Sequence, residues 1–288
     1  MSNDARVAVI GGSGLYLFDG MDDVREVVVD TPFGPTSDAI AIGRLDGVEV
    51  AFLPRHGRGH RLLPTEVPYR ANIWALKSLG VTRIFSASAV GSMKEEVALA
   101  KPVLVDQFID RTHGRASTFF GQGIVAHVSM AEPTCPALRA LLASQARALG
   151  IDVIAGGTYV CIEGPQFSSR AESFMYRDVG VDVIGMTNVT EAKLAREAEI
   201  CYATIALPTD YDCWHDAHEA VSVEFVIATL SKGIGRARAL IAGAIAHLDQ
   251  AGPCACGNAL ANAIMTDPAR IPDEARRRLA PIVGRHLG

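Results

Sequence analysis

The sequence predicts an α/β fold built as a single domain of 288 residues. Short apolar runs rich in β-branched residues alternate with longer segments of helical periodicity, which is typical of strands and helices that build one sheet. The apolar share of the residues is 49%, so the chain can bury a sizeable core. No repeat or linker divides the sequence. We therefore expect one domain over residues 1–250 and an appendage over 251–288 that belongs to the same unit.

The first half of the chain is expected to be mainly sheet. Apolar runs bounded by glycine or proline predict strands over residues 7–10, 27–29 and 48–53. A helix is expected after Pro68 and should end at Gly80, because one helical face carries Tyr69, Ile73, Leu76 and Leu79. Further strands are expected from Val81 and over residues 102–109.

Helices and strands alternate in the second half. A helix is expected over residues 135–149, with an inward face made of Leu138, Leu141, Leu142 and Leu149. Ser169 and Glu172 stand at capping-box spacing, so another helix should begin directly after Phe167. Strands are expected near residues 151–162, 181–186 and 201–208, and a long helix over 223–248. The tail contains a short helical segment.

The charge of the chain excludes some classes of partner. Its net charge is −5 at pH 7, whereas a nucleic acid or a membrane surface favours a basic face. No uncharged apolar run reaches about 18 residues, and the first residues lack the basic and then apolar order of a signal peptide. We therefore expect a cytoplasmic protein that acts on a small molecule and binds neither nucleic acid nor membrane.

A glycine-rich turn around Ser13 follows the first strand. It resembles a dinucleotide fingerprint, but Leu17 occupies the third glycine position, and the next strand follows too soon for a crossover helix. The turn still suits a phosphate, because its backbone N–H groups and the Ser13 hydroxyl can face an anion.

Two further segments have the composition of an anion site. Arg55 and His56 follow a predicted strand, and a guanidinium can fork onto two phosphate oxygens while an imidazole donates a further bond. Ser88, Ala89 and Thr187 are expected at strand ends, where α/β sheets bind ligands. The alternatives are a solvated basic loop, a patch for the acidic groups of a partner, and ordinary strand-end chemistry.

The pair Asp210 and Asp212 is the most informative feature of the sequence. The two carboxylates follow an apolar strand one residue apart, so period-2 geometry points them in the same direction. Two like charges raise each other's pKa, and a carboxyl that keeps its proton near neutral pH can protonate a leaving group. The alternative is a solvated turn.

No metal site is expected. Among the six cysteines, Cys254 and Cys256 form a C-x-C pair, but no second pair or histidine follows at ligand spacing, so inert buried thiols are favoured over a redox pair or half a metal site. The run His215-x-x-His218-Glu219 has the wrong spacing for a zinc helix, and a solvated loop is expected there.

Taken together, these segments resemble the purine nucleoside phosphorylases, and most closely the 5'-methylthioadenosine phosphorylases of that superfamily. The resemblance covers about residues 6 to 248 and is most specific in GGSGL, PRHGRGHRLLPTEVPYRANIWALKSLG, IEGPQFSSRAESFMYRDVGVDVIGMTN and TDYDCWHDAHEAVSV. It implies a single domain whose twisted mixed sheet closes towards a barrel and is flanked by helices. It also implies a homotrimer with active sites near the subunit boundaries.

The resemblance assigns roles to residues in three groups. The implied phosphate site consists of Ser13, Arg55, His56, Ser88, Ala89 and Thr187. Asp210 would face N7 of the purine as the catalytic acid, Ser168 and Asp212 would complete recognition of the base, and Phe167 and Met186 would line the sugar. The 5' substituent would lie among Val223, Val226, Ile227 and the His127 of a neighbouring subunit.

The implied reaction is the phosphate-dependent cleavage of 5'-methylthioadenosine to adenine and 5-methylthioribose 1-phosphate, in purine and methionine salvage. Phosphate is a co-substrate, and no cofactor is expected. The alternatives are a phosphorylase for 6-oxopurine nucleosides or methylthioinosine, a hydrolase on the same fold, and a non-catalytic nucleoside-binding regulator.

Overall fold

The computed structural model describes residues 7–12, 15, 20–215 and 223–287, with the backbone alone for residues 223–228. Its strands are β1 (Val7–Gly11), β2 (Asp22–Val27), β3 (Ile40–Leu45), β4 (Val48–Pro54), β5 (Arg83–Ser92), β6 (Val103–Leu104), β7 (Gln107–Arg111), β8 (Ile154–Ala155), β9 (Thr158–Ile162), β10 (Val183–Gly185) and β11 (Cys201–Asp210). The helices are α1 (Tyr69–Ser78), α2 (Pro136–Leu149), α3 (Arg170–Asp178), α4 (Asn188–Glu197), α5 (Val223–Ala246), α6 (Asp273–Arg278) and α7 (Ala280–Val283).

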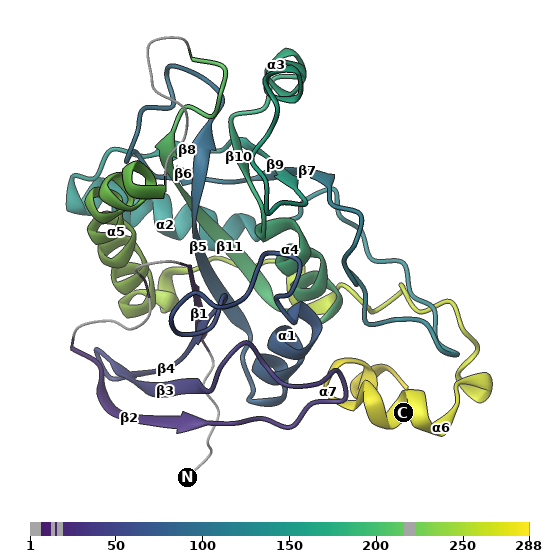
Figure 1. Ribbon diagram of the computed structural model, residues 1–288. Coiled ribbons are helices and arrows are strands. Elements are labelled where there is room, and N and C mark those ends of the chain that lie inside the picture. The colour runs from purple at the N-terminus through teal and green to yellow at the C-terminus, as the bar shows by residue number, and fades with distance from the viewer. Residues whose placement is uncertain (1–6, 13–14, 16–19, 216–222, 288) are drawn as a thin grey trace.

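The strands form one mixed sheet around β5 (Figure 1). The main path runs β2-β3-β4-β1-β5-β10-β9-β7, while β11 pairs with β5 and β6, and β6 pairs with β8. β5 is parallel to β1 and β11 and antiparallel to β10. The predicted α/β fold with a mixed sheet and flanking helices is confirmed. Hydrogen bonds among the described strands leave this sheet open rather than closed into a barrel.

The two faces of the sheet are buried under different helices. Ala8 and Ile10 of β1 belong to a core cluster with α1 and α4, whereas Val7 and Val9 belong to a second cluster with α2 and α5. This alternation follows from the period-2 geometry of a strand. The sheet is therefore a layer between two helical layers, as the ribbon in Figure 1 shows.

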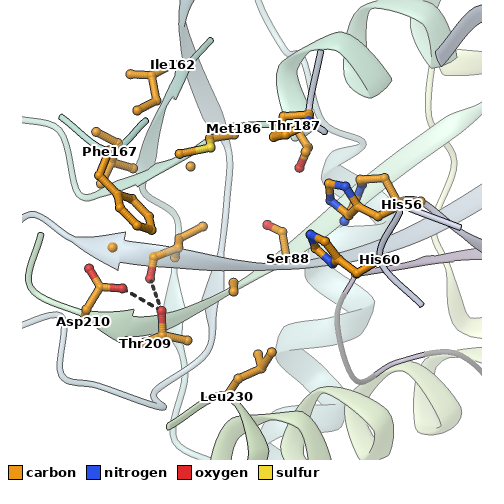
Figure 2. A pocket seen from close by; sticks show the side chains of 18 of the residues that line it. His56, His60, Ser88, Ile162, Phe167, Met186, Thr187, Thr209, Asp210 and Leu230 are labelled. Atoms are coloured by element: carbon orange, nitrogen blue, oxygen red, sulfur yellow. Dashed lines mark hydrogen bonds between the residues drawn. The ribbon is translucent and has the colours of Figure 1, made fainter. Parts of the chain in front are cut away.

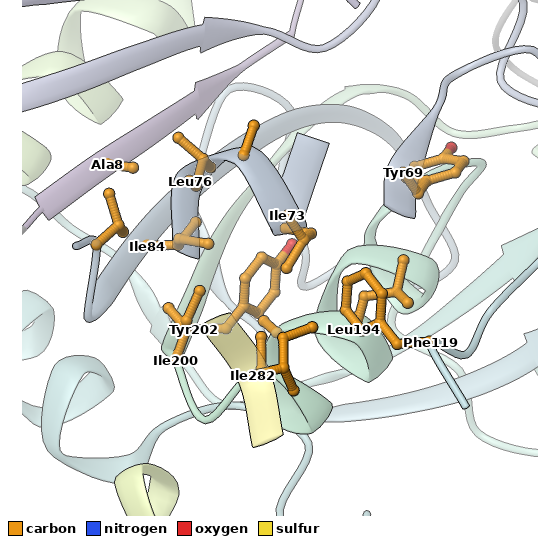
Figure 3. Packing of buried hydrophobic residues seen from close by; sticks show 14 of the residues in the cluster. Ala8, Tyr69, Ile73, Leu76, Ile84, Phe119, Leu194, Ile200, Tyr202 and Ile282 are labelled. Carbon is orange, nitrogen blue, oxygen red and sulfur yellow. The ribbon is translucent and has the colours of Figure 1, made fainter. Parts of the chain in front are cut away.

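The C-terminal segment contributes to the first cluster. Ile282 of α7 is 1% exposed and lies beside Leu194 and Tyr202 (Figure 3). The indole N–H of Trp74 in α1 also donates to the carbonyl of Arg278, at 2.9 Å. Residues beyond 250 therefore pack into the same core as the sheet.

Local sequence signals explain several element boundaries. Ser169 is the N-cap of α3, and its side chain and Glu172 form the predicted capping box. α2 begins with Pro136 and ends before Gly150, which has the left-handed conformation that glycine adopts most easily. These boundaries could be predicted because they depend on neighbouring residues alone.

Other expectations were wrong. The strand expected over 102–109 is interrupted between β6 and β7, the strand expected at 27–29 is β2 at Asp22–Val27, and β3 and α4 were not predicted. Leu149 was expected to face inward but is 49% exposed, because it occupies the last turn of α2. α4 was missed because it contains the polar residues Asn188, Thr190 and Glu191, all of which the fold buries.

In the part of the chain that the structure describes, no helix combines the length and apolar character needed to cross a membrane.

We predict that Ile282→Ala lowers the free energy of unfolding by about 2–5 kcal/mol, because it leaves a cavity in the cluster shared by α1, α4 and α7. Denaturant titration followed by circular dichroism measures the change. Val28→Ala is the control: Val28 is 83% exposed, so its truncation should alter the free energy by no more than about 0.5 kcal/mol. Equal effects of the two substitutions would contradict a structural role for the C-terminal segment.

Candidate active site

A pocket of about 790 Å³ opens beside β5, β10 and the end of β11 (Figure 2). This volume lies within the usual range for small-molecule sites. Its walls come from segments that are far apart in the sequence, and they include Gly12, Arg55, His56, His60, Ser88, Ala89, Gly91, Ile162, Phe167, Ser168, Met186, Thr187, Thr209, Asp210, Asp212, Leu230 and Ile234. The pocket therefore unites the predicted anion loops with the aspartate pair.

A buried ion pair lies at one end of the pocket. The Arg55 guanidinium and the Glu191 carboxylate are 1% and 2% exposed, and Nε of Arg55 donates to Oε1 of Glu191. Arg55 also donates to the Ser86 hydroxyl at 2.6 Å and to the Ala87 carbonyl at 3.0 Å. Burial acts to lower the pKa of Arg55, but the charge of Glu191 more than offsets it and the pKa is raised. Arg55 is therefore charged but already paired.

Asn188 extends this pair into a network beneath the pocket. Its amide nitrogen donates to the hydroxyls of Tyr202 and Thr204, at 2.8 and 2.9 Å. Its amide oxygen accepts a bond from Ser88, at 2.6 Å. Every partner is buried, so the network fixes β5, β11 and the first turn of α4 relative to one another.

Little net charge remains at this end of the pocket. Glu191 balances Arg55, and burial together with the charge of Arg55 lowers the pKa of His56 from 6.5 to about 4, which leaves the imidazole neutral at pH 7. The remaining attraction for an anion comes from the N-terminus of α4, where Thr187 is the N-cap and lines the pocket. The exposed N–H groups and dipole of a helix N-terminus favour an anion.

The tautomer of His56 follows from one contact. Nδ1 lies 2.9 Å from the carbonyl oxygen of Leu62, and a carbonyl can only accept a hydrogen bond. Nδ1 therefore carries the proton of the neutral ring, and Nε2 is an acceptor. His60 stacks on His56 with ring centroids 4.3 Å apart, and burial lowers its pKa as well.

The carboxyl groups of Asp210 and Asp212 lie at the other end of the pocket. Asp210 is the last residue of β11, and its Oδ1 accepts a bond from the backbone N–H of Asp212 at 2.9 Å. Gly91 on β5 leaves room for this arrangement, because a Cβ at residue 91 would stand 3.0 Å from Oδ1 of Asp210. Both carboxyl groups line the pocket. The expected strand alternation was wrong, because β11 ends at Asp210 and Asp212 lies in the turn that follows.

Burial raises the pKa of Asp210, and the negative charge of Asp212 raises it further. The hydrogen bonds from Thr209 and from the Asp212 backbone act in the opposite direction, but the pKa remains raised. The Thr209 hydroxyl lies 2.7 Å from Oδ2 of Asp210 and 3.2 Å from the Val90 carbonyl (Figure 2). A hydroxyl has one proton, so it can donate to ionised Asp210, or donate to Val90 and accept a bond from protonated Asp210. The site therefore accommodates both protonation states.

Asp212 shows one sign of a ligand site. Its φ of 49° lies in the left-handed region, which aspartate adopts more readily than most residues, so the backbone conformation alone does not indicate function. Oδ2 of Asp212 and the Ser168 hydroxyl are buried, and neither has a hydrogen-bond partner among the described residues. Burial raises the pKa of Asp212, and the nearby Ser173 hydroxyl acts against this effect. Since buried polar atoms are normally paired, the Ser168 hydroxyl fits a partner supplied by a ligand, and Oδ2 of Asp212 can take one in addition to the nearby Ser173.

The structure also locates the remaining predicted residues. Met186 lies between the two ends of the pocket, whereas Phe167 lies across from Asp210 (Figure 2) and is 53% exposed. His127 is exposed and does not line the pocket; its backbone N–H donates to the Ala263 carbonyl. Ser13 and the side chains of Val223, Val226 and Ile227 lie outside the described residues, as do His218 and Glu219.

Sequence reasoning missed several residues that hold the site. Glu191 was not considered, although a buried arginine requires an acidic partner. Thr209 lay within the quoted motif and was overlooked. Arg115 has no motif of its own, yet its side chain is 1% exposed and donates to the backbone carbonyls of Glu163 and Met186. No local sequence signal identifies Arg115, because its partners lie far along the chain.

The sequence profile of the phosphorylase superfamily matches residues 6–246. The S-methyl-5'-thioadenosine phosphorylase of Geobacter sulfurreducens is 57% identical over 282 residues, which cover 98% of this chain and 99% of that relative. The enzyme of the same name from Cereibacter sphaeroides is 56% identical over 284 residues, which cover 98% of both chains.

Solved structures show the same similarity. A methylthioadenosine phosphorylase sourced from an antarctic soil metagenomic library has a TM-score of 0.92 and 51% sequence identity, and the match covers 97% of this chain and 99% of that one. The methylthioadenosine phosphorylase of Schistosoma mansoni in complex with adenine has a TM-score of 0.80 and 40% identity, with 84% and 91% of the two chains covered.

We predict that Glu191→Gln lowers the free energy of unfolding by about 3–5 kcal/mol, because it leaves the Arg55 cation buried without an opposite charge. Denaturant titration again measures the change. Glu26→Gln is the matched control, since Glu26 pairs with Arg58 at the surface, where both side chains are more than half exposed, and its loss should cost less than about 1 kcal/mol. A loss at Glu191 as small as that of the control would mean that the buried pair does not stabilise the fold.

Proposed function

The chain belongs to the phosphorylase superfamily, and on this premise we propose that it cleaves 5'-methylthioadenosine with phosphate, releasing adenine and 5-methylthioribose 1-phosphate. The observation that carries the proposal is the composition of the pocket. A buried aspartate with a raised pKa stands at one end, and hydroxyls, an imidazole and a helix N-terminus stand at the other. Cleavage of a nucleoside by phosphate needs both ends at once.

The reaction makes opposite demands on the two ends. As the bond between C1' and N9 breaks, its electron pair moves to the purine, the ribose becomes cationic, and a phosphate oxygen forms the new bond to C1'. An anion is needed beside the sugar and a proton beside the base. We assign the first role to phosphate held by the residues around Arg55 and the second to Asp210.

The base end suits adenine. Asp210 protonates or shares a proton with N7, and its raised pKa makes the protonated form available. Adenine presents N7 as an acceptor and N6–H₂ as a donor, so an ionised Asp212 can accept from N6 through its unpaired Oδ2. A 6-oxo group would repel that oxygen. Ser168, which has a similarly unpaired hydroxyl, completes the base contacts.

We assign the phosphate end to Arg55, His56, Ser88, Ala89 and Thr187, which line the pocket, and to Ser13, which lies outside the described residues. Since Nε2 of neutral His56 is an acceptor, this ring accepts a hydrogen bond from the P–O–H group of monoanionic phosphate, or takes up a proton and donates to the dianion. Arg55 would donate to phosphate through its second Nη1 N–H, because the other four guanidinium N–H groups are bonded to Glu191, Ser86 and Ala87. The ion pair with Glu191 holds that N–H in place.

The middle of the pocket is suited to a thioether-bearing sugar. Met186 lies there, with Phe167 towards the Asp210 end, and we place the ribose against these two side chains. A methylthio group gains roughly 25 cal/mol for each Å² of apolar area that leaves water, whereas a 5'-hydroxyl loses its bonds to water. Val223, Val226 and Ile227 are our candidates for this apolar wall.

We further propose a cytoplasmic homotrimer that acts in purine and methionine salvage without a cofactor. The exposed position of His127, away from the pocket of its own chain, supports a role for it in the site of a neighbouring subunit. No membrane or nucleic-acid partner is proposed, in keeping with the net charge of −5.

We predict that adenine release requires added phosphate. The test incubates 5'-methylthioadenosine, adenosine and inosine with the protein, with and without phosphate, and follows the free base by chromatography. We expect the highest kcat/KM with 5'-methylthioadenosine. Base release without phosphate would indicate a hydrolase, a preference for inosine would indicate a 6-oxopurine phosphorylase, and binding without turnover would indicate a non-catalytic regulator.

We predict that Asp210→Asn lowers kcat for 5'-methylthioadenosine by about 10²–10⁴, the usual contribution of a general acid, and relaxes the 6-amino preference. In the native protein the protonated form exists below the raised pKa of Asp210, so kcat/KM should fall as the pH rises through that pKa. The variant should lose this limb of the pH profile. Asp178→Asn, at an exposed aspartate that ends α3, is the control. It should leave kcat and the pH profile of kcat/KM unchanged. An unchanged rate for Asp210→Asn would remove Asp210 from the mechanism.

A further inference from the structure

Four of the six cysteines meet at one point of the fold. Cys135 is the N-cap of α2, Cys201 is the first residue of β11, and Cys254 and Cys256 lie in the C-terminal segment. Their four sulfur atoms all lie within 4.8 Å of one another, and those of Cys201 and Cys254 are 3.3 Å apart. The three segments are remote in sequence, so only the folded chain assembles this group, which we call the thiol cluster.

The dimensions of the thiol cluster match those of a metal tetrahedron. Zn²⁺ binds thiolate sulfur at about 2.3 Å, so the six sulfur-sulfur edges of a tetrahedral site are each about 3.8 Å. One sulfur-sulfur distance is 3.3 Å and none of the six exceeds 4.8 Å, so the thiol cluster has the size that a tetrahedral site requires. A disulfide instead requires two sulfur atoms about 2.05 Å apart, whereas all four cysteines are free thiols in this structure.

We propose that Cys135, Cys201, Cys254 and Cys256 bind one Zn²⁺ ion as a structural tetrathiolate site. Four protein ligands complete the tetrahedral coordination and leave no open position for a substrate, which is characteristic of structural rather than catalytic zinc. On binding, each of the four thiols loses its proton to solvent and forms one Zn–S bond. No oxidant or reductant takes part.

The surroundings of the thiol cluster suit such a site. Cys135 and Cys256 are buried in the apolar cluster beneath α2 and α5, and Cys201 and Cys254 pack against that cluster. Apolar walls exclude water and strengthen the attraction between the ion and its thiolates. Cys135 also stands at the N-terminus of the 14-residue helix α2, where the helix dipole favours negative charge on its sulfur.

The proposed ion would fasten the C-terminal segment to the strand that carries the active site. Cys201 begins β11 and Asp210 ends it, so the thiol cluster is about 30 Å from the carboxyl end of the pocket, at about 3.3 Å per residue. Cys254 and Cys256 precede Leu260 and Ile282, which are buried in the cluster on the other face of the sheet. The ion would act on folding and on the anchoring of residues 251–288, and would take no part in the chemistry.

The test begins with the metal content of the whole protein, purified under reducing conditions and passed through a chelating resin. After addition of Zn²⁺ and removal of the excess, elemental analysis should find about one ion per chain. Replacement by Co²⁺ should produce the intense thiolate-to-metal charge-transfer absorption and the visible bands of a tetrahedral site. Chelation should lower the melting temperature, and Zn²⁺ should restore it.

Variants separate the thiol cluster from adventitious binding. The double variant Cys254→Ser, Cys256→Ser should not bind the ion, and addition of Zn²⁺ should not raise its melting temperature. Cys213→Ser, which removes a half-buried thiol outside the thiol cluster, should retain about one ion per chain. Because the double variant can fail to fold, the Co²⁺ spectrum of the native chain is an independent measurement.

Three results would overturn the proposal. The first is a fully reduced native chain that binds neither Zn²⁺ nor Co²⁺. The second is retention of the ion by the double variant. The third is a protein isolated with disulfides among these cysteines, detected by its mass before and after reduction, whose reduced form does not take up metal. None of these results bears on phosphate-dependent cleavage, which depends on the pocket at the other end of β11.

Discussion

The buried ion pair between Arg55 and Glu191 is the interaction on which the pocket depends. Placing two charges in the core is costly unless each is fully paired, and the hydroxyls of Ser86 and Tyr202 supply the additional bonds. The pair joins the end of β4 to α4 across β5, and these are the elements whose residues surround the anion end.

The chemistry of the pocket depends on the near absence of net charge around Arg55 and His56. With Arg55 balanced by Glu191 and His56 kept neutral, the proposed phosphate end would attract an anion through aligned donors and the N-terminus of α4 rather than through a net positive charge. The opposite end keeps two buried carboxyl groups with raised pKa values, and the charge of Asp212 contributes to the raised pKa of Asp210. A phosphate and a protonated carboxyl on opposite sides of one sugar are what the proposed bond cleavage requires.

β11 links the two sites of the molecule. Its last residue, Asp210, enters the pocket, and its first residue, Cys201, enters the thiol cluster with the C-terminal segment. The strand is buried along most of its length and pairs with β5 over nearly all of it. Any constraint on the thiol cluster therefore bears on the strand that positions the acid, although the two chemistries remain separate.

The sequence alone determined whatever depends on neighbouring residues. Strand and helix alternation predicted the α/β class, the Ser169 and Glu172 spacing predicted the start of α3, and the residues around Arg55, Ser88 and Asp210 were recognised as one site through their motifs. Tertiary structure decided the rest, because it depends on contacts between distant segments: that Glu191 neutralises Arg55, that Leu62 sets the tautomer of His56, and that Arg115 holds the Met186 backbone. The cysteines show this division most clearly. The C-x-C pair at 254 and 256 has no ligand at suitable spacing in the sequence, and only the fold brings Cys135 and Cys201 beside it.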